Sequence, residues 1–524
     1  MAARELPSPI RRFVPVAIVV AGAALIWLLF GHGFANYDTF YSLVWGNEIF
    51  NGLKPDYGAP IPPTPHPLQT LQGVLLAPFG DGAEPITVAI AFLSLAAVAY
   101  FAYRLGQLWF GVPAGLVAAA VVLTREPILS NGVRAYVDLP YIALVLAALV
   151  VETKRPKAGW PVLALLALAG LLRPEAWLFS FAYLAYLAYT RFAPSTIAAL
   201  RAAHRSRSGL VQVVAPTRRD RVNRVLLSIA HAVRQPPFLA LAALAAAGPV
   251  IWVLYDVVFA GNALYSLTGT QDTVQTLGRD TGIVDWVRFF PRRLGEILRE
   301  PVLLGAAGGG VLTLWLLRDR AKLGAAAGFL AAGAFALLAF AGLAVITRYA
   351  MLAAVILAIF CGAGVFGWVK LPEDHPRRRW WMAFGALVAV TFVVFAPGQH
   401  DRLERLQDSI ATQEEIRDDL EEIADSDAIE AGCEPVTVPN HRPVPLLALW
   451  LERRPSQIVT AVEESGGELV RIEPESGYYF DPASAVVEEN FTLDPNDPGE
   501  LTAPVPAGFE RVEENESWVL YARC

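Results

Sequence analysis

The chain has 524 residues, of which 55% are hydrophobic and 17% are charged. This composition excludes an ordinary soluble protein and indicates an integral membrane protein. The net charge of −7 hides two parts, because the chain from Gln399 onward holds 29 acids against 9 bases and the preceding part is net basic. A basic membrane part is typical of positive cytoplasmic loops, so nucleic acid is not an expected partner.

Eleven apolar runs are candidate transmembrane helices. They lie near residues 14–30, 84–103, 112–124, 138–152, 159–172, 176–190, 238–260, 301–317, 324–345, 350–369 and 380–397. The first is too long and too apolar for a cleaved signal peptide, so we expect a signal anchor, although Gly33-Phe34-Ala35 resembles a cleavage site. The predicted fold class is mainly α, a polytopic helical bundle of about eleven spans over residues 1–397.

Positive charges between the runs predict the orientation in the cell membrane. Arg4, Arg11 and Arg12 precede the first run, which places the N-terminus in the cytoplasm. The longest loop on that side, about 191–237, has nine arginines against the single Asp220. This positive charge is consistent with binding to anionic lipid or with a role in membrane topology alone, and we favour the second interpretation. An odd number of spans then puts the C-terminal part outside.

The outer loops hold two short amphipathic segments. The first loop, about 31–66, has apolar residues at helical spacing between Phe40 and Phe50, which predicts a helix in the membrane interface. Pro67 to Phe79 is apolar but too short to span, so we expect a second interfacial or re-entrant segment. The other sizeable outer loop runs from about 261 to 300.

The C-terminal part is predicted to be a helical stalk over residues 398–424 and a small extracytoplasmic α/β domain over 425–524. Short apolar runs alternate there with turns rich in proline and glycine. Cys433 and Cys524 bracket this domain and would lie in an oxidising compartment, so we expect them to form a disulfide. Cys361 falls within a span and should remain a buried thiol.

Ionisable residues recur at span ends on the predicted outer side. They come from four separate segments and are Asp38 with Tyr37, Arg134 with Asp138, Arg173 with Glu175, and Arg348 with Tyr349; His66 lies nearby in the first outer loop. Because ionisable groups at membrane depth cost roughly 2.5 to 3.5 kcal/mol each, they persist mainly where they are paired, hydrated or functional. The pattern predicts one shared site.

Each of these residues also has a structural interpretation that the sequence leaves open. Asp38 and Asp138 both stand where a helix N-cap is expected. The Arg-Pro-Glu run at 173–175 is typical of a helix start with a local ion pair. Arg348 could extend its charge to the interface, and His66 could be an ordinary loop histidine.

The combination resembles the GT-C superfamily of membrane glycosyltransferases, which use polyprenyl-phosphate sugars. The segments that carry the resemblance are YDTFYSLVWGNEIF, RAYVDLPYIALVLAALV, LLRPEAWLF and TRYAMLAAVILAIFCGAG. LLRPEAWLF resembles an element of the bacterial cell-envelope branch. The WWD-like motif of the oligosaccharyltransferase branch is absent, and Asp38 is followed by Thr39 where many protein mannosyltransferases have glutamate.

The resemblance implies an inverting hexosyl- or pentosyltransferase. It makes Asp38 the catalytic base and adds the carboxylates of Asp138 and Glu175 to the catalytic site. Arg348, with Arg134 or Arg173, would bind the donor phosphate, since the guanidinium is always charged and presents a fork of donors. Some relatives use a divalent metal, and the sequence offers two aspartates but no dedicated cluster, so metal use is left open.

The sequence therefore favours an extracytoplasmic-face enzyme that moves a sugar from a polyprenyl-phosphate donor onto a cell-envelope glycan, lipid or protein. Two alternatives remain: a polytopic lipid or solute transporter, and a membrane-anchored glycan-binding module. Transporters usually have paired halves and polar residues near the bilayer midplane, and neither is found in this sequence.

Overall fold

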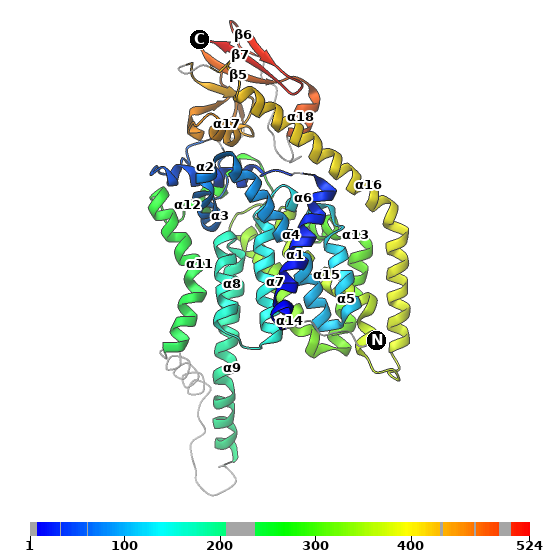
Figure 1. The fold of residues 1–524 in the computed structure, drawn as a ribbon. Helices are drawn as coiled ribbons and strands as arrows, with labels where there is room; N and C mark the ends of the chain where they lie inside the picture. Colours follow the sequence, from blue (N-terminus) through cyan, green and yellow to red (C-terminus); the bar gives the residue numbers. More distant parts are fainter. Residues whose placement is uncertain are drawn as a thin grey trace.

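The computed structural model describes residues 8–31, 33–59, 61–205, 236–429, 433–465, 468–491 and 505–524. Helices lie side by side in a bundle, and a small sheet domain caps one end of it (Figure 1). Most of the basic loop expected at 191–237, including Asp220, and also Arg4 lie outside the described residues.

All eleven predicted runs correspond to helices. They are α1 (Ser8–Phe30), α4 (Ala83–Phe110), α5 (Val112–Val122), α7 (Asp138–Lys154), α8 (Trp160–Leu172), α9 (Glu175–Arg205), α11 (Pro236–Ala260), α13 (Gly282–Leu316), α14 (Arg318–Phe340), α15 (Met351–Phe366) and α16 (Arg378–Ala424). In the described chain, seven helices are long and apolar enough to cross a membrane, or eight if the bent pair of α5 and α6 (Glu126–Val133) is one span. This is fewer than eleven, partly because α7 and α8 have 17 and 13 residues, below the roughly 20 that a span needs.

Helix α15 lies at the centre of the bundle, and 89% of its most apolar stretch is buried. It packs against α13 and α5 through small residues. A Cβ atom at Gly309 would collide with the carbonyl of Phe360, and one at Gly364 would collide with that of Gly305. These glycines therefore allow the close backbone approach that membrane helix pairs use.

A layer of short helices covers the end of the bundle that faces the sheet domain. It contains α2 (Tyr37–Phe50), α3 (Pro67–Leu76), the 3-10 turn η1 (Ala77–Gly82) and α12 (Tyr265–Thr276). Helices α2 and α3 cross where Gly46 meets Gly73, since a Cβ at Gly46 would overlap the Gly73 backbone. The predicted short helices exist, but Phe40, Tyr41 and Trp45 of α2 are almost fully buried because the C-terminal domain covers them.

The C-terminal domain contains a five-stranded mixed sheet in the order β2-β1-β5-β7-β6. Its strands are β1 (Val436–Val438), β2 (Ile458–Thr460), β5 (Gly477–Pro482), β6 (Glu510–Glu514) and β7 (Trp518–Arg523). Strand β1 pairs in parallel with β2 and β5, whereas β7 pairs antiparallel with β5 and β6. The hairpin β3 (Val462–Ser465) and β4 (Glu468–Arg471) and the helices α17 (Val444–Trp450) and α18 (Ala485–Phe491) complete an α/β domain.

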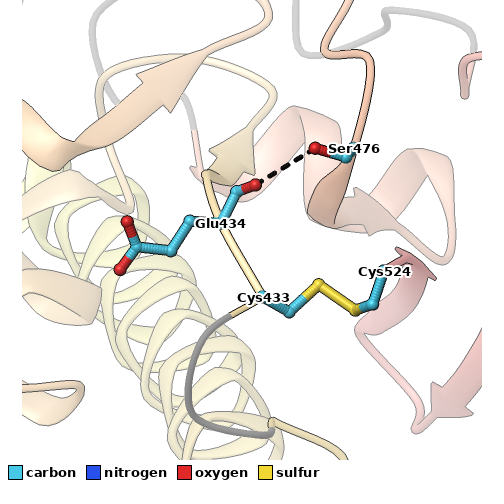
Figure 2. The surroundings of a disulfide bond; sticks show 4 residues. All are labelled: Cys433, Glu434, Ser476 and Cys524. Atoms are coloured by element: carbon cyan, nitrogen blue, oxygen red, sulfur yellow. Dashed lines mark hydrogen bonds between the residues drawn. A yellow bond between two sulfur atoms is a disulfide. The ribbon is translucent and has the colours of Figure 1, made fainter.

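A disulfide joins Cys433, before β1, to Cys524, after β7, across a sequence separation of 91 residues (Figure 2). Beside it, the Ser476 hydroxyl donates a hydrogen bond to the carbonyl of Glu434. Cys361 is a free, buried thiol in α15. The bridge therefore connects the start of β1 to the end of β7.

Helix α16 runs without interruption for 47 residues, from the far end of the bundle to the sheet domain (Figure 1). Its C-terminal half was expected to be a solvated stalk, yet a regular series of its side chains is buried: Leu406, Ile410, Gln413, Ile416, Leu420 and Ile423. The spacing of three and four residues is that of one helix face. This half of α16 is amphipathic and joins the core that α2 shares with the sheet domain.

Helix α1 begins near the end of the bundle opposite to the sheet domain (Figure 1). This agrees with a chain whose two ends are separated by the membrane. The side of the membrane that each end faces stays a prediction from the distribution of positive charge.

Candidate functional site

A cavity of about 1320 Å³ lies between the bundle and the layer that contains α2, α3 and α12. Eight of the nine predicted site residues line it: Tyr37, Asp38, His66, Arg134, Arg173, Glu175, Arg348 and Tyr349. Asp138 does not reach the wall and lies buried behind it, paired with Arg173. The four segments that the sequence separates by up to 310 positions therefore meet at one place.

Asp38 and Arg348 form an ion pair at this cavity. Asn36 is the N-cap of α2, and its Oδ1 atom accepts hydrogen bonds from the backbone N–H groups of Asp38 and Thr39. The capping role proposed as an alternative for Asp38 thus belongs to Asn36, and the Asp38 carboxylate is available for other contacts. It accepts a 2.6 Å hydrogen bond from Nη1 of Arg348, which lies in the 3-10 turn η3 (Thr347–Ala350).

The surroundings of Asp38 keep it ionised. Burial raises the pKa of a carboxyl group, but the adjacent Arg348, followed by His66 and Arg279, outweighs that effect and holds the pKa of Asp38 below its usual value. The position of Asp38 in the first turn of α2 acts in the same direction, because a helix N-terminus favours negative charge. The side chain remains 17% exposed to the cavity.

Arg173 is held between two carboxylates. Its Nη1 donates to Asp138 at 2.7 Å, and its Nη2 donates to Glu175 at 2.6 Å. The guanidinium also lies 4.4 Å from the ring centroid of Tyr349. The local ion pair suggested by the Arg-Pro-Glu run therefore exists and is extended by Asp138, which begins α7 without capping it through its side chain. One cation between two buried anions leaves a net negative charge.

His66 caps the start of α3 without a side-chain hydrogen bond to the helix and is 8% exposed. Burial, together with the charge of Arg173, lowers its pKa to about 3 despite the opposing effect of Asp38. The imidazole is therefore neutral at physiological pH. Its Nδ1 atom is buried and has no hydrogen-bond partner among the described residues.

Arg134 binds mainly to protein groups. Its Nε and Nη2 atoms donate to Oε1 of Gln413 on α16 at 3.0 and 2.8 Å, and its Nη1 atom donates to Ser130. Its carbonyl accepts from the side chain of Asn36. Arg134 thus ties α6, α16 and the start of α2 together at the cavity edge, and most of its donors are already used.

The cavity also contains basic residues that the sequence analysis missed. Arg279, Arg292 and Arg293 come from the segment between α12 and the first turns of α13, and Arg442 comes from the C-terminal domain. Arg293 donates to the carbonyl of Val345 at 3.1 Å and pairs with Glu296. For Arg279, Arg292 and Arg293 the available signal was their place in the outer loop near 261–300, and no motif marks these residues or Arg442.

Among the described residues, no group of three or more histidine, cysteine, aspartate or glutamate side chains is arranged to hold a metal ion. The two aspartates that the sequence offered as metal ligands are each paired with an arginine, Asp38 with Arg348 and Asp138 with Arg173. The cavity wall therefore combines several arginines with carboxylates, and the Asp38 carboxylate remains partly exposed beside Arg348.

No protein-family model and no curated protein matches the chain. Among solved structures it is similar to ArnT from Cupriavidus metallidurans in the apo state, with 13% identity and a TM-score of 0.46 over 98% of each chain. It is also similar to the oligosaccharyltransferase AglB from Archaeoglobus fulgidus in complex with an inhibitory peptide and a dolichol-phosphate, with 13% identity and a TM-score of 0.42 over 86% of this chain and 65% of that one. The apo form of the Archaeoglobus fulgidus enzyme gives the same identity and coverage with a TM-score of 0.41.

At this level of similarity the matches assign no substrate. The function has to be argued from the residues of the cavity.

Proposed function

We propose that this protein is a membrane glycosyltransferase that transfers a sugar from a polyprenyl-phosphate donor to a cell-envelope glycan, lipid or protein, on the extracytoplasmic face and with inversion. The observation that carries the proposal is the Asp38–Arg348 pair on the wall of a large cavity at one end of a transmembrane bundle. A sugar transfer from a lipid phosphate needs one base and one phosphate-binding cation close together.

Asp38 is the proposed base. It is ionised, partly exposed and held on a rigid helix whose start is fixed by Asn36. The acceptor hydroxyl would attack the anomeric carbon of the donor while its proton passes to the Asp38 carboxylate. The bond between the anomeric carbon and the phosphate oxygen breaks in the same step, and its electron pair stays with the polyprenyl phosphate.

Arg348 is the proposed phosphate ligand. Its Nη1 atom binds Asp38, and the side chain is 24% exposed to the cavity. A guanidinium can therefore bridge the base and a phosphate oxygen, and it would stabilise the negative charge that develops on the leaving phosphate. The nearby arginines of the α12–α13 segment give the cavity further cations for a charged donor.

Arg173, Asp138 and Glu175 act in this proposal as positioning residues. The three side chains are at most 5% exposed and are joined by short hydrogen bonds. They fix the ring of Tyr349, which stacks on Arg173 and follows Arg348 directly in the chain. In this proposal Asp138 and Glu175 are therefore not catalytic groups themselves. They hold Arg348 in place through Arg173 and Tyr349.

The test is transfer by the purified full chain with a panel of polyprenyl-phosphate hexoses and pentoses. Asp38→Asn should lower the transfer rate roughly 100- to 10,000-fold, the usual contribution of a general base, while leaving expression and donor binding near wild type. Asp319→Asn is a matched control, because Asp319 is 95% exposed at the other end of the bundle. Near-wild-type transfer by Asp38→Asn would remove Asp38 as the base, and donor movement without transfer would favour the transporter alternative.

A further inference from the structure

A second hollow adjoins the cavity on the side of α6 and α16. It consists of a pocket of about 350 Å³ and a groove of about 680 Å³, and both are lined by Arg299 and Arg402. Glu126, Arg134 and Ser409 line the pocket and also the main cavity. The hollow is therefore a neighbour of the proposed active site and not part of its Asp38 wall.

Four arginines dominate this hollow, and we call it the arginine groove: Arg125, Arg299, Arg402 and Arg405. Its carboxylates are Glu126 and Glu300. In the part of the chain that the structure describes, none of the four arginines forms an ion pair with an acidic side chain. Among the described residues the groove thus has an excess of positive charge, four arginines against two carboxylates.

Arg125 is built into the groove. Helix α13 is broken at Arg299, whose φ is +63°, and at Pro301, and such a break leaves a carbonyl without its helical partner. Arg125 donates from Nη1 to the carbonyl of Leu298 at 3.2 Å, which satisfies this group and fixes the guanidinium. Arg125 is only 6% exposed, and its Nε atom has no hydrogen-bond partner among the described residues.

A buried cation without a counterion is costly, by several kcal/mol after relaxation. Arg299 and Arg402 lie close enough to Arg125 for their charges to oppose its own. The four arginines also lie at the bundle end that carries Asp38, where the charge rule for membrane proteins predicts few basic residues. An anion in the groove would relieve this repulsion.

Apart from Thr124, Gln399 and His400, the rest of the groove is apolar. Val117, Val121, Phe392, Phe395 and Leu403 line it, from α5 and α16. The same stretch of α16 exposes Val393 and Val394 on the outside of the bundle. An anion that fits here therefore carries hydrocarbon chains, and it can arrive sideways from the bilayer.

We propose that the arginine groove binds an anionic glycerophospholipid, with its phosphodiester on the four arginines and its acyl chains along α5 and α16. Arginine suits a phosphodiester because its donors form a fixed, permanently charged fork. A bilayer phospholipid matches the groove better than the polyprenyl donor, because the groove opens to the lipid-facing side, whereas Asp38, the proposed base for transfer, lines the main cavity. The site goes beyond the proposed transfer reaction and does not depend on it.

The experiment uses the purified full chain in phosphatidylcholine nanodiscs with a small fraction of phosphatidylglycerol, and the readout is bound lipid by native mass spectrometry. The wild type should retain one phosphatidylglycerol. The double variant Arg402→Gln/Arg405→Gln should lower its retention at least tenfold. Ala120→Trp, which places a ring in the exposed apolar part of the groove, should lower retention with all arginines intact.

The matched control is Arg320→Gln/Arg379→Gln, because both arginines are exposed and begin α14 and α16 at the opposite end of the bundle. It should retain phosphatidylglycerol, and so should Asp38→Asn, which separates this site from the proposed active site. Equal retention by the arginine-groove variants overturns the proposal. Inorganic phosphate or polyprenyl phosphate that displaces phosphatidylglycerol at equal concentration overturns the choice of a bilayer phospholipid.

Discussion

Arg348 determines the charge state of Asp38, because it is the strongest of the interactions that oppose the effect of burial on this carboxyl. With Arg348 present, the pKa of Asp38 lies below its ordinary value of about 4, so the base stays ionised as the pH falls through the range in which exposed carboxyls take up protons. The acidic limb of the activity profile should therefore lie below about pH 4.

Arg348→Gln should move that limb to higher pH, because burial then raises the pKa of Asp38 with less opposition. It should also weaken binding of the polyprenyl-phosphate donor. Infrared difference spectra would follow the carboxyl band of protonated Asp38, with Asp38→Asn identifying the band. If the acidic limb of the activity profile and the donor binding were both unchanged, the alternative would hold, in which Arg348 only extends its charge to the membrane interface.

Asp138, Glu175 and Arg173 illustrate what single residues in a sequence can and cannot tell. The Arg-Pro-Glu run predicted a local ion pair, and that pair exists. The third partner, Asp138, lies 35 positions earlier and was interpreted as a helix cap or a catalytic group. Only the packing of α7 against α8 brings it to Arg173, and no local pattern encodes that approach.

At the scale of elements, the C-terminal domain fixes α2 and its loop through a buried polar cluster. The Asp56 carboxylate accepts from the backbone N–H of Ser456 at 2.9 Å, and the Asp56 backbone N–H donates to Glu48 at 2.7 Å. Arg454 donates to Glu48 at 3.3 Å. Burial raises the pKa of Glu48, and both the Asp56 backbone N–H and the charge of Arg454 oppose that rise.

Asp56→Ala should loosen the C-terminal domain on α2, because the Ser456 N–H and the Gly58 N–H both lose their acceptor. Loss of a buried hydrogen-bond acceptor costs about 1 to 3 kcal/mol. Hydrogen exchange should increase in α2 and around Ser456 and stay unchanged in α15. Asp319→Asn again serves as the control, and unchanged exchange in α2 would contradict a clamping role for this cluster.

The helices were predictable as elements because each carries a long apolar run, and the two short helices before α4 were predictable from their length. The surroundings of α2 were not. Its apolar residues predicted a helix lying on the membrane interface, whereas Phe40 packs 6.0 Å from the Trp450 ring of α17. An amphipathic pattern shows that a face is buried but does not show whether lipid or protein covers it.

At the scale of the whole molecule, the disulfide closes the sheet domain on itself. The bridged residues are 91 positions apart, and a loop of that size contributes roughly 4 to 5 kcal/mol in the chain-entropy model. Cys433→Ser should lower the unfolding free energy of the domain by about that amount, and hydrogen exchange in β5 and β7 would report it.

Cys361→Ala is the matched control for the bridge, since Cys361 is free and lies in the bundle. Non-reducing peptide mapping of the native protein should recover Cys433 and Cys524 joined. Recovery of both as alkylated thiols would contradict both the bridge and the extracytoplasmic position of the domain.

The core that α2 shares with the C-terminal domain also has a consequence for the order of synthesis. Phe40, Tyr41 and Trp45 leave the ribosome about 400 residues before the strands and α17 that bury them. At roughly 5 to 20 residues per second, that interval lasts roughly 20 to 80 seconds. During it the helix that bears Asp38 has an uncovered aromatic face, and the lipid headgroup region is the one nearby environment that suits both its rings and its carboxylate. The nascent chain would therefore keep α2 at the bilayer surface first and transfer it to protein contacts only after the last domain has emerged.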